Sequence, residues 1–253
     1  MNITESLFTG KNSIYLPEVD STNIFAMNLL SKTNPPEGTC VHTAYQSAGR
    51  GQIGRFWHSS EGKNLLISYI LYPKQLKAID QFILSIISGL ACRDVVAMYC
   101  KNVKIKWPND IYVDDKKIAG ILVQNILRGA DIKATVVGIG LNVNELSFPL
   151  EIPNPVSIGQ ITSKSHDLTE IKQMLSAKLE FYYMKMKYGH YEWLKEKYIN
   201  TMYRMNETAN FKTDGDTIII GKIQGINAQG KLLIQAENEE IMTFGFREIG
   251  YVI

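Results

Sequence analysis

The 253-residue chain lacks a long apolar run, so no membrane-spanning helix is predicted. Crossing a bilayer takes about 18 or more consecutive apolar residues. The longest apolar stretch, residues 82–91, is shorter and carries serines. The N-terminal residues also lack the basic region and apolar run of a signal peptide. We therefore predict a cytoplasmic protein.

Neither sign of charge is in excess. Lys and Arg number 27 and Asp and Glu number 25, so the formal net charge is +2. Bulk charge therefore gives no argument for binding nucleic acid or a membrane surface. A hydrophobic share of 45% and a charged share of 21% are typical of a globular protein. The length suffices for one large domain with a small appendage.

Cysteine and histidine are scarce. The three cysteines, Cys40, Cys92 and Cys100, cannot all pair and form no C-x-x-C motif, so we predict buried free thiols. The four histidines are scattered, and no H-E-x-x-H motif occurs. These absences argue against a transition metal held by the protein.

Glycine is concentrated in residues 46–57, with the sequence QSAGRGQIGRFW. Glycine weakens the interior of a helix or a strand. This density therefore predicts an irregular loop whose backbone approaches a ligand closely. Arg50 and Arg55 within the loop are suited to binding anionic groups.

Gly49, Gly51 and Gly54 form a G-x-G-x-x-G pattern after a predicted strand. A dinucleotide site also needs a helix that opens at the third glycine and an acidic residue about 20 positions further on. Residues 55–64 are turn-like instead, and Asp80 opens a helix. We therefore reject a nicotinamide site.

Small polar residues cluster before the first predicted helix, at residues 24–32. Asp20, Ser21 and Thr22 are all suitable N-caps, and with Asn23 they exceed what one cap needs. A helix N-terminus also offers N–H groups to a polar ligand. Local sequence alone favours capping over a ligand site.

The hydrophobic patterns predict several strands. They are expected at residues 39–46, 65–72, 102–107 and 132–144, and in a hairpin at 111–127 with Asp114-Asp115 at its tip. Gly138 and Gly140 lie inside a strand, where glycine is unfavourable. They therefore mark a close approach by a ligand or by backbone.

Helices are predicted between and after these strands. Residues 79–100 predict a largely buried helix capped by Asp80. Asp167 and Glu170 match a capping box that starts a helical stretch running to about residue 200 and broken near Gly189.

The hydrophobic pattern of the sequence changes after about residue 205. Four or five short strands follow, enough for a small SH3-like barrel. We therefore predict two domains, residues 1–205 and 206–253.

Lys117 follows Lys116 at the start of an apolar strand. The local pattern favours a solvated hairpin lysine over a cation aimed into a pocket. Asn109 and Asp110 likewise fit ordinary turn chemistry, although Asp110 would matter beside a phosphate-bound Mg²⁺. Residues 148–165 form a proline-containing loop of a kind that closes over a site.

Five segments in order carry a resemblance to a known family. They are EVDSTN (18–23), QSAGRGQIGRFW (46–57), KWPND (106–110), KKIAGIL (116–122) and VVGIGLNVN (136–144), followed by the small β-domain. Together they resemble bacterial biotin–protein ligases over essentially the whole chain. Lipoate–protein ligases and octanoyltransferases share that fold but not the pairing of GRGxxGR with KWPND.

The resemblance implies an α+β fold, with a mixed or antiparallel sheet flanked by helices and an SH3-like barrel. It implies a biotin–[acetyl-CoA-carboxylase] ligase whose catalytic domain is residues 1–205. Such an enzyme forms biotinyl-5′-AMP from biotin and ATP with Mg²⁺. It then transfers biotin to a lysine of a biotin carboxyl carrier domain of a carboxylase. Both monomers and homodimers occur in the family.

The resemblance also implies the site residues. Lys117 and Arg50 would be catalytic. The biotin-binding residues would be Ser21, Thr22, Asn23, Gln46, Gly49, Arg50, Gly51, Gln52, Gly120 and Leu122. The nucleotide-binding residues would be Trp57, Asn109, Asp110, Lys117 and Asn142. No residue is expected to be a metal ligand.

Three features depart from the family pattern or invite another interpretation. Gln52 stands where the family usually has an arginine that helps to retain the adenylate, so we predict faster loss of biotinyl-AMP. About a dozen residues precede the first expected strand, too few for a winged helix-turn-helix, so we predict a monofunctional ligase without DNA binding. Met184-Lys185-Met186 resembles the acceptor tripeptide of carrier domains, but its helical pattern predicts an unmodified Lys185.

Alternative functions remain open at this stage. A lipoate or octanoate ligase or transferase of the same fold would use lipoate or octanoate and not biotin. A non-catalytic biotin-binding module would bind biotin without releasing pyrophosphate from ATP. An RNA-binding protein is disfavoured by the near-neutral charge.

Overall fold

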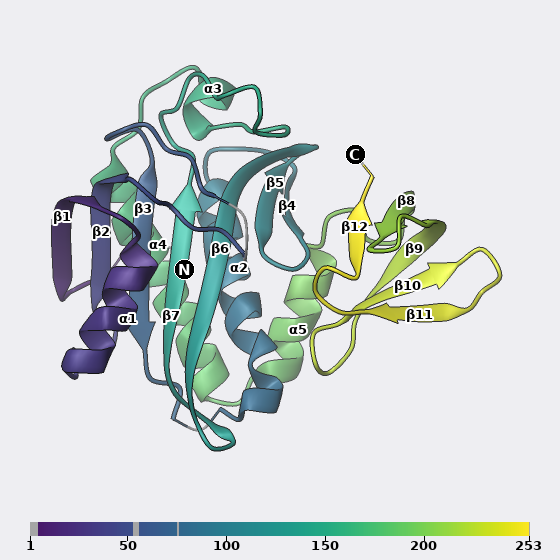
Figure 1. Cartoon of the computed structure of the whole chain (residues 1–253), viewed down its shortest axis with the longest axis horizontal. Coiled ribbons are helices and arrows are strands. Elements are labelled where there is room, and N and C mark those ends of the chain that lie inside the picture. Colours follow the sequence, from purple (N-terminus) through teal and green to yellow (C-terminus); the bar gives the residue numbers. More distant parts are fainter. Residues whose placement is uncertain (1–4, 53–55, 75, 253) are drawn as a thin grey trace.

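The computed structural model describes residues 5–52, 56–74 and 76–252 and contains a seven-stranded mixed sheet with helices on both faces (Figure 1). The strand order is β1-β2-β3-β7-β6-β5-β4, with β1 parallel to β2 and the other neighbours antiparallel. The strands are β1 (Ser13–Val19), β2 (Cys40–Gln46), β3 (Leu65–Leu71), β4 (Val103–Lys106), β5 (Asp110–Val113), β6 (Lys116–Arg128) and β7 (Asp131–Leu141). The predicted α+β class is confirmed.

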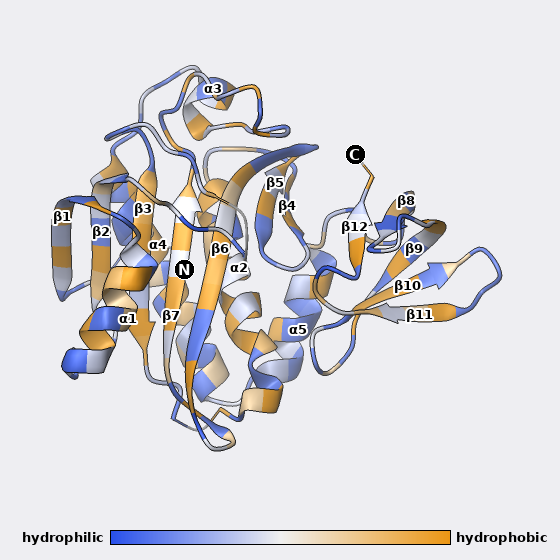
Figure 2. Cartoon of the chain, in the orientation of Figure 1, coloured by the Kyte–Doolittle hydropathy of each residue, from blue (hydrophilic) through white to orange (hydrophobic). Residues whose placement is uncertain are grey.

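Strand β3 shows why the sheet is covered on both faces. All its residues are buried. Ile67 and Tyr69 belong to the main core, whereas Ile70 belongs to a smaller cluster under helix α1. Successive side chains of a strand point to opposite faces, so apolar residues on both faces place β3 between two covering layers. Figure 2 shows similar apolar residues along β7.

The two helix layers are unequal (Figure 1). Helix α1 (Thr22–Lys32) packs on β2, β3 and β7 on one face. Helices α2 (Phe82–Val96), α4 (Leu168–Lys187) and α5 (Tyr191–Asn200) form the opposite layer. The remaining short elements are η1 (Ala78–Asp80), a 3-10 turn, and α3 (Ile158–Thr162).

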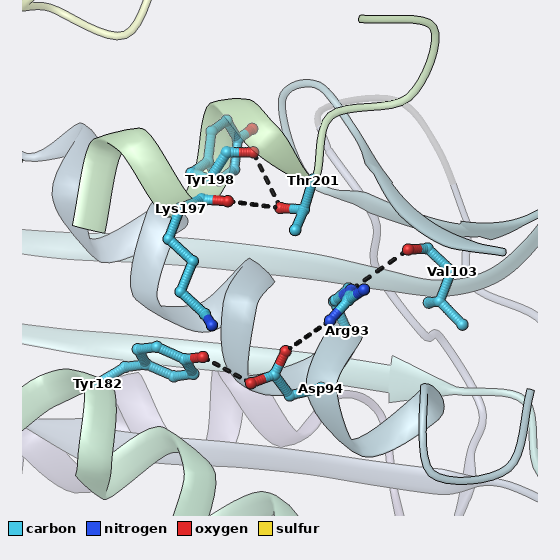
Figure 3. A network of polar contacts seen from close by, with 7 residues as sticks. All are labelled: Arg93, Asp94, Val103, Tyr182, Lys197, Tyr198 and Thr201. Carbon is cyan, nitrogen blue, oxygen red and sulfur yellow. Dashed lines mark hydrogen bonds and ion pairs between the residues drawn. The ribbon is translucent and has the colours of Figure 1, made fainter. Parts of the chain in front are cut away.

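Polar contacts join the larger helix layer to the sheet (Figure 3). Asp94 of α2 accepts a hydrogen bond from Tyr182 Oη of α4 at 2.6 Å and pairs with Arg93 Nη1 at 3.0 Å. Arg93 Nε also donates to Val103 O of β4 at 3.3 Å. Burial, and then the bond to Asp94, raises the pKa of Tyr182, so this phenol stays a neutral donor. These bonds fix α2 against both α4 and the edge strand.

The C-terminal part forms a second sheet of five antiparallel strands, in the order β11-β10-β9-β8-β12, which fits an SH3-like domain. It lies beside the β4–β5 end of the first sheet (Figure 1), and Trp107 Nε1 donates to Gly230 O across the junction at 2.9 Å. Its strands are β8 (Thr208–Thr213), β9 (Ile218–Ile226), β10 (Leu232–Ala236), β11 (Ile241–Phe244) and β12 (Ile249–Tyr251). The domain boundary after residue 205 stays a prediction.

The predicted cap at Asp80 is wrong, whereas Asp167 caps α4 as predicted but without the capping box. Helix α2 begins at Phe82, so Asp80 lies one residue before the N-cap position and ends the 3-10 turn instead. From there its carboxylate is not placed to accept from the first free N–H groups of α2. At α4, Asp167 accepts from Thr169 N–H at 2.7 Å. A capping box with Glu170 would have required the bond to the next N–H.

Other predictions about the elements are confirmed. Helices α4 and α5 are separated at Gly189, and the hairpin tip lies at Asp114-Asp115 between β5 and β6. All three cysteines are buried and free. In the part of the chain that the structure describes, no helix combines the length and apolarity needed to cross a membrane.

Candidate functional site

A cavity of about 910 Å³ lies beside the N-terminus of α1, on the face of the sheet that α1 covers only in part. Small-molecule sites typically measure about 300–1,000 Å³. Every predicted site residue lines it: Ser21, Thr22, Asn23, Gln46, Gly49, Arg50, Gly51, Gln52, Trp57, Asn109, Asp110, Lys117, Gly120, Leu122 and Asn142. Gly54 and Arg55, also expected in the ligand-binding loop, lie outside the described residues.

Glycines of β6 and β7 line one side of the cavity. A Cβ at Gly140 would overlap the Trp57 indole, and one at Gly138 would overlap Asn23 Oδ1. A Cβ at Gly120 would lie 2.9 Å from Trp57 Cζ3. The close approach predicted at Gly138 and Gly140 therefore exists, but side chains make it rather than a ligand or backbone.

The first turn of α1 is capped by another strand, which corrects the local interpretation. Ser21 occupies the N-cap position, but its side chain makes no capping bond to the described residues. Gln46 Oε1, at the end of β2, instead accepts from Thr22 N–H at 2.8 Å. Ser21, Thr22 and Asn23 are only 3–4% exposed. Their side chains are therefore available to shape a dry, polar end of the cavity.

Strands β6 and β3, on either side of β7, hold Asn23 in place. Its Nδ2 donates to Leu122 O at 3.2 Å and to Gln124 Oε1 at 2.9 Å, both on β6. Its Oδ1 lies 2.6 Å from Ser68 Oγ of β3, and Ser68 Oγ lies 2.7 Å from Thr22 Oγ1. Hydrogen bonds from the sheet therefore fix the polar end of the cavity.

Lys117 points into the cavity, so the interpretation as a solvated hairpin lysine is wrong. Its Nζ lies 2.8 Å from Asp110 Oδ1 and 5.6 Å from the centroid of the Trp57 ring. The Lys117 and Asp110 side chains are 30% and 17% exposed. This places a cation and a carboxylate together in the cavity that Arg50 also lines.

A bulge explains the orientation of Lys117. In regular pairing Lys117 and Gly120 would face opposite sides of β6, because side chains alternate. The β5–β6 register shifts between Ile111 and Tyr112, so that Tyr112 pairs with Lys117 and the fully buried Ile118 is passed over. Such a bulge re-aims a side chain, and here it brings Lys117 onto the cavity face.

The proline-containing loop borders the cavity, as expected, through residues 148 and 152–155. It is attached to the backbone of Lys117: Lys117 N–H donates to Asn154 O at 2.8 Å, and Val156 N–H donates to Lys117 O at 3.0 Å. Asn154 Nδ2 also donates to Asp115 O at the hairpin tip at 2.6 Å. The loop and the lysine therefore hold each other in position.

Within residues 5–52, 56–74 and 76–252, four buried side-chain polar atoms lack a hydrogen-bond partner: Thr9 Oγ1, Trp57 Nε1, Asn142 Oδ1 and Tyr251 Oη. Trp57, Asn142 and Tyr251 line the cavity. Because buried polar groups are normally hydrogen-bonded, these three side chains are placed to bind polar groups of a ligand.

Sequence reasoning missed Lys106, Tyr112 and Tyr251, which also line the cavity. Lys106 Nζ lies 3.0 Å from Tyr112 Oη and 5.0 Å from the centroid of the Tyr251 ring. Lys106 belongs to the KWPND segment, so the motif could have indicated it. Tyr251 comes from β12, and no local pattern marks it. Burial raises its pKa, so this phenol stays neutral.

Two further observations concern other kinds of site. Residues 56–64 form a bridge, loop and turn rather than a helix, in agreement with the rejection of a nicotinamide site. Across the described ranges, no group of three or more His, Cys, Asp or Glu side chains is arranged to hold a metal ion.

Comparison with known proteins identifies the family. The model of the Biotin/lipoate A/B protein ligase family matches residues 15–142. The chain is 31% identical to the bifunctional ligase/repressor BirA of Bacillus subtilis, over 92% of this chain and 71% of that protein. It is 28% identical to the biotin–[acetyl-CoA-carboxylase] ligase of Paracoccus denitrificans, over 87% and 92%. The biotin protein ligase from Aquifex aeolicus, solved in complex with biotin and ATP, shares 30% identity over 95% of this chain and 98% of that one, with a TM-score of 0.78. The chain therefore belongs to the Biotin/lipoate A/B protein ligase family.

Proposed function

We propose that this protein is a biotin–protein ligase. It activates biotin with ATP to biotinyl-5′-AMP and transfers biotin to a lysine of a biotin carboxyl carrier domain. The names of its relatives support this function, including one named for acetyl-CoA carboxylase and one solved with biotin and ATP.

One observation carries the proposal: a single cavity has a dry polar end and a charged end. The polar end, at Thr22, Asn23 and Gln46, suits a compact group with N–H donors and a carbonyl acceptor. The charged end, at Lys117 and Arg50, suits a carboxylate and phosphates. Biotin has its ureido ring and its carboxylate at opposite ends, so it matches both.

In the first step, a carboxylate oxygen of biotin attacks the α-phosphorus of ATP. An O–P bond forms, and the bond to pyrophosphate breaks. Lys117 stabilises the negative charge that gathers between the reactants, while Asp110 holds its ammonium group at 2.8 Å. Arg50 supplies a second cation from the glycine-rich loop. Holding biotin and ATP in line for the attack contributes further to the rate enhancement.

Trp57, Asn109 and Asn142 line the part of the cavity assigned to the nucleotide. The unpartnered Trp57 Nε1 and Asn142 Oδ1 provide a donor and an acceptor there. Mg²⁺, when bound, neutralises part of the triphosphate charge. Asp110 offers one carboxylate, which fits the usual binding of Mg²⁺ by one or two carboxylates together with phosphates and water.

In the second step, the amine of the carrier lysine attacks the carbonyl carbon of the mixed anhydride. A C–N bond forms, the bond to AMP breaks, and the amine loses a proton. The protein's task is to position the amine and to keep water away from the anhydride. The loop at residues 148–156 borders the cavity and is placed to serve this purpose.

The proposal is tested by incubating the protein with biotin, Mg-ATP and a carrier domain, and measuring pyrophosphate release and carrier biotinylation. Lys117→Ala should slow pyrophosphate release by about 10²–10³-fold, as expected when a preorganised charge is removed. Lys116→Ala is the matched control, because Lys116 is exposed, and it should remain close to wild type.

Other outcomes would overturn either the proposed function or the proposed role of Lys117. Activity with lipoate or octanoate and none with biotin would indicate the other branch of the family. Biotin binding without pyrophosphate release would indicate a non-catalytic module. Equal activity of Lys117→Ala and wild type would leave biotin ligation intact but refute the role of Lys117.

The finer aspects remain predictions as well. We place the reaction in the cytoplasm, supported by three buried cysteines without a disulfide. We also expect that these 253 residues do not bind DNA and that they form a monomer or a homodimer. Salt-sensitive, sequence-specific retention of DNA in a gel-shift assay would contradict the expectation about DNA binding.

A further inference from the structure

We propose that Glu145 is a positioning residue for the nucleotide: its buried carboxylate holds the segment that carries Trp57 against the segment that carries Asn142. Glu145 is 5% exposed and does not itself line the cavity, whereas Trp57 and Asn142 do. The inference rests on the proposed function, because that function assigns Trp57 and Asn142 to the nucleotide.

Three donors from the segment after the glycine-rich loop meet the Glu145 carboxylate. Ser60 N–H donates to Oε2 at 3.0 Å, and Ser60 Oγ donates to Oε1 at 3.1 Å. Asn64 Nδ2 donates to Oε2 at 3.1 Å. A carboxylate can only accept, so all three hydrogen bonds run toward Glu145. The position of residues 60–64 therefore depends on where this carboxylate lies.

Asn64 fixes the pairing of the two segments. Val143 N–H donates to Asn64 Oδ1 at 2.9 Å, so the amide NH₂ must face the other way. There it donates to Glu145 and, at 3.1 Å, to Ser59 Oγ. Asn64 is only 1% exposed, so water cannot easily replace these partners. Segments that lie 79–85 residues apart in the sequence thus share one buried network.

Each segment leads to one residue assigned to the nucleotide. Trp57 lies three residues before Ser60, and its N–H donates to Gly49 O at 2.9 Å. Asn142 lies three residues before Glu145, at the end of β7. The indole and the amide therefore reach the cavity from two segments that the Glu145 side chain joins.

The backbone of Glu145 contributes to the orientation of Asn142. Ser157 Oγ donates to Glu145 O at 2.5 Å, and the neighbouring Val156 O accepts from Asn142 Nδ2 at 3.1 Å. Because Val156 O can only accept, the NH₂ group of Asn142 faces it and Oδ1 is left for a donor on the ligand. The Glu145 side chain then sets the place of Trp57 Nε1, the donor, relative to this acceptor.

Removing the carboxylate should affect ATP and biotin differently. Ser60 and Asn64 would lose their acceptor, and residues 57–60 would have to shift to satisfy the freed donors. The polar end of the cavity is built from Thr22 and Gln46 instead, whose hydrogen bond does not involve Glu145. We therefore expect the nucleotide to lose affinity while biotin keeps it.

The test measures KM for ATP in biotin-dependent pyrophosphate release at saturating biotin, and biotin affinity by calorimetry. Glu145→Ala should raise KM for ATP about tenfold or more, the value of one or two hydrogen bonds to the nucleotide. Biotin affinity should stay within about threefold of wild type, a change smaller than one hydrogen bond to a buried partner.

Two conservative variants separate the hydrogen bonds from the charge. Glu145→Gln loses the charge but can keep all three bonds, with its oxygen in the place of Oε2 and its NH₂ donating to Ser60 Oγ. It should keep KM for ATP within about twofold of wild type. Glu145→Asp keeps the charge but withdraws the carboxylate by one methylene, so it should raise KM for ATP about fivefold or more.

Glu180→Ala is the matched control for lost stability. Glu180 is 7% exposed, lies outside the cavity lining, and also accepts three hydrogen bonds, from the N–H groups of Leu7, Phe8 and Thr9. A loss of folded enzyme lowers the maximal rate but not KM. Glu180→Ala should therefore leave KM for ATP unchanged, even where it lowers the melting temperature as much as Glu145→Ala.

The possible results are distinct. If wild type releases no pyrophosphate from ATP with biotin, the proposed function fails. If wild type is active and Glu145→Asp keeps KM for ATP within twofold, only this inference is overturned, even where Glu145→Ala does not fold. A rise in KM for Glu145→Gln as large as that for Glu145→Asp would assign the effect to charge and overturn the positioning role. An equal rise for Glu180→Ala, or an equal loss of biotin affinity in Glu145→Asp, would also overturn it.

Discussion

At the scale of single residues, the absence of a side chain at Gly138 is a condition for the polar end of the cavity. Gly138→Ala would place a methyl group where Asn23 Oδ1 lies. Asn23 would have to move and lose its bond to Ser68. We expect biotin affinity to fall about tenfold or more, measured by calorimetry, because a buried polar group loses its partner.

Gly215→Ala is the control for this substitution. The nearest atom to a Cβ at Gly215 is 3.9 Å away, so it should leave biotin affinity unchanged. An unaltered affinity in Gly138→Ala would mean that Asn23 is not held as the structure indicates.

Gln52 makes a second prediction at this scale. It lines the cavity, at the position where the family usually carries an arginine that helps to retain the adenylate. A neutral amide attracts the phosphate of biotinyl-AMP less than a guanidinium does. We expect Gln52→Arg to release biotinyl-AMP more slowly than wild type, measured by single-turnover release of labelled adenylate.

The matched control is Gln173→Arg, which adds the same charge at an exposed position on α4. It should release the adenylate at the wild-type rate. Equal release from Gln52→Arg and wild type would show that another cation already performs the retention.

At the scale of elements, the β5–β6 hairpin that carries Lys117 is held from both sides at its tip. Tyr203 Oη donates to Asp115 Oδ1, and Asn154 Nδ2 donates to Asp115 O. Tyr203 belongs to the segment before β8, and its N–H donates to Ile105 O of β4 at 2.9 Å. The hairpin is thus tied both to the loop over the cavity and to the connection with the C-terminal sheet.

Tyr203→Phe should loosen the hairpin without unfolding it, since the ring is retained. Burial, and then the bond to Asp115, raises the pKa of Tyr203 to about 12, so in wild type the phenol donates throughout the working pH range. We expect adenylation to slow several-fold, measured as single-turnover pyrophosphate release, because Lys117 is held less firmly. Biotin affinity should be unchanged.

Tyr188→Phe provides the control, because Tyr188 is 73% exposed. If Tyr203→Phe weakens biotin binding and adenylation equally, the hydrogen bond between Tyr203 and Asp115 supports the whole cavity rather than Lys117 alone. An unchanged adenylation rate would refute the link altogether.

At the scale of the whole molecule, the two sheets meet at Gly230. This residue has φ +79°, its carbonyl accepts from Trp107 Nε1, and a Cβ there would overlap the Phe82 ring. Gly189, between α4 and α5, has the same φ of +79°, but no atom of the described residues lies within 4 Å of the position that a Cβ would take. Comparing alanine substitutions at Gly189 and Gly230 therefore separates the cost of backbone strain from the cost of steric overlap.

We expect Gly189→Ala to lower the free energy of unfolding by about 1–2 kcal/mol, the cost of a left-handed backbone for a residue with a Cβ. Gly230→Ala should cost about 1–3 kcal/mol more, because the added methyl group overpacks the junction. Denaturant unfolding measures both. If the two substitutions lowered the free energy of unfolding equally, the methyl group at residue 230 would be accommodated at the junction without a steric penalty.

Much of the fold was predictable because local patterns determine elements. Partial alternation predicted β2, branched and aromatic residues predicted β3, and Gly189 predicted the break between α4 and α5. Predictions failed where a neighbour in space decides the outcome. Capping chemistry at Ser21 depended on Gln46, and the direction of Lys117 depended on a bulge opposite it. Neither can be seen within a window of local sequence.

The amino-acid sequence by itself determined the order of the strands and helices along the chain and the set of polar residues that the family resemblance brought together. Their hydrophobic periods and motifs are local properties, so they can be derived without a fold. Only the tertiary structure decided which way these side chains point. Ser68 under Thr22, Trp57 against Gly140 and Tyr251 beside Lys106 are contacts between distant segments. Such contacts form only when the sheets close, because packing and hydrogen bonding across strands, rather than position in the chain, set each side chain's partners.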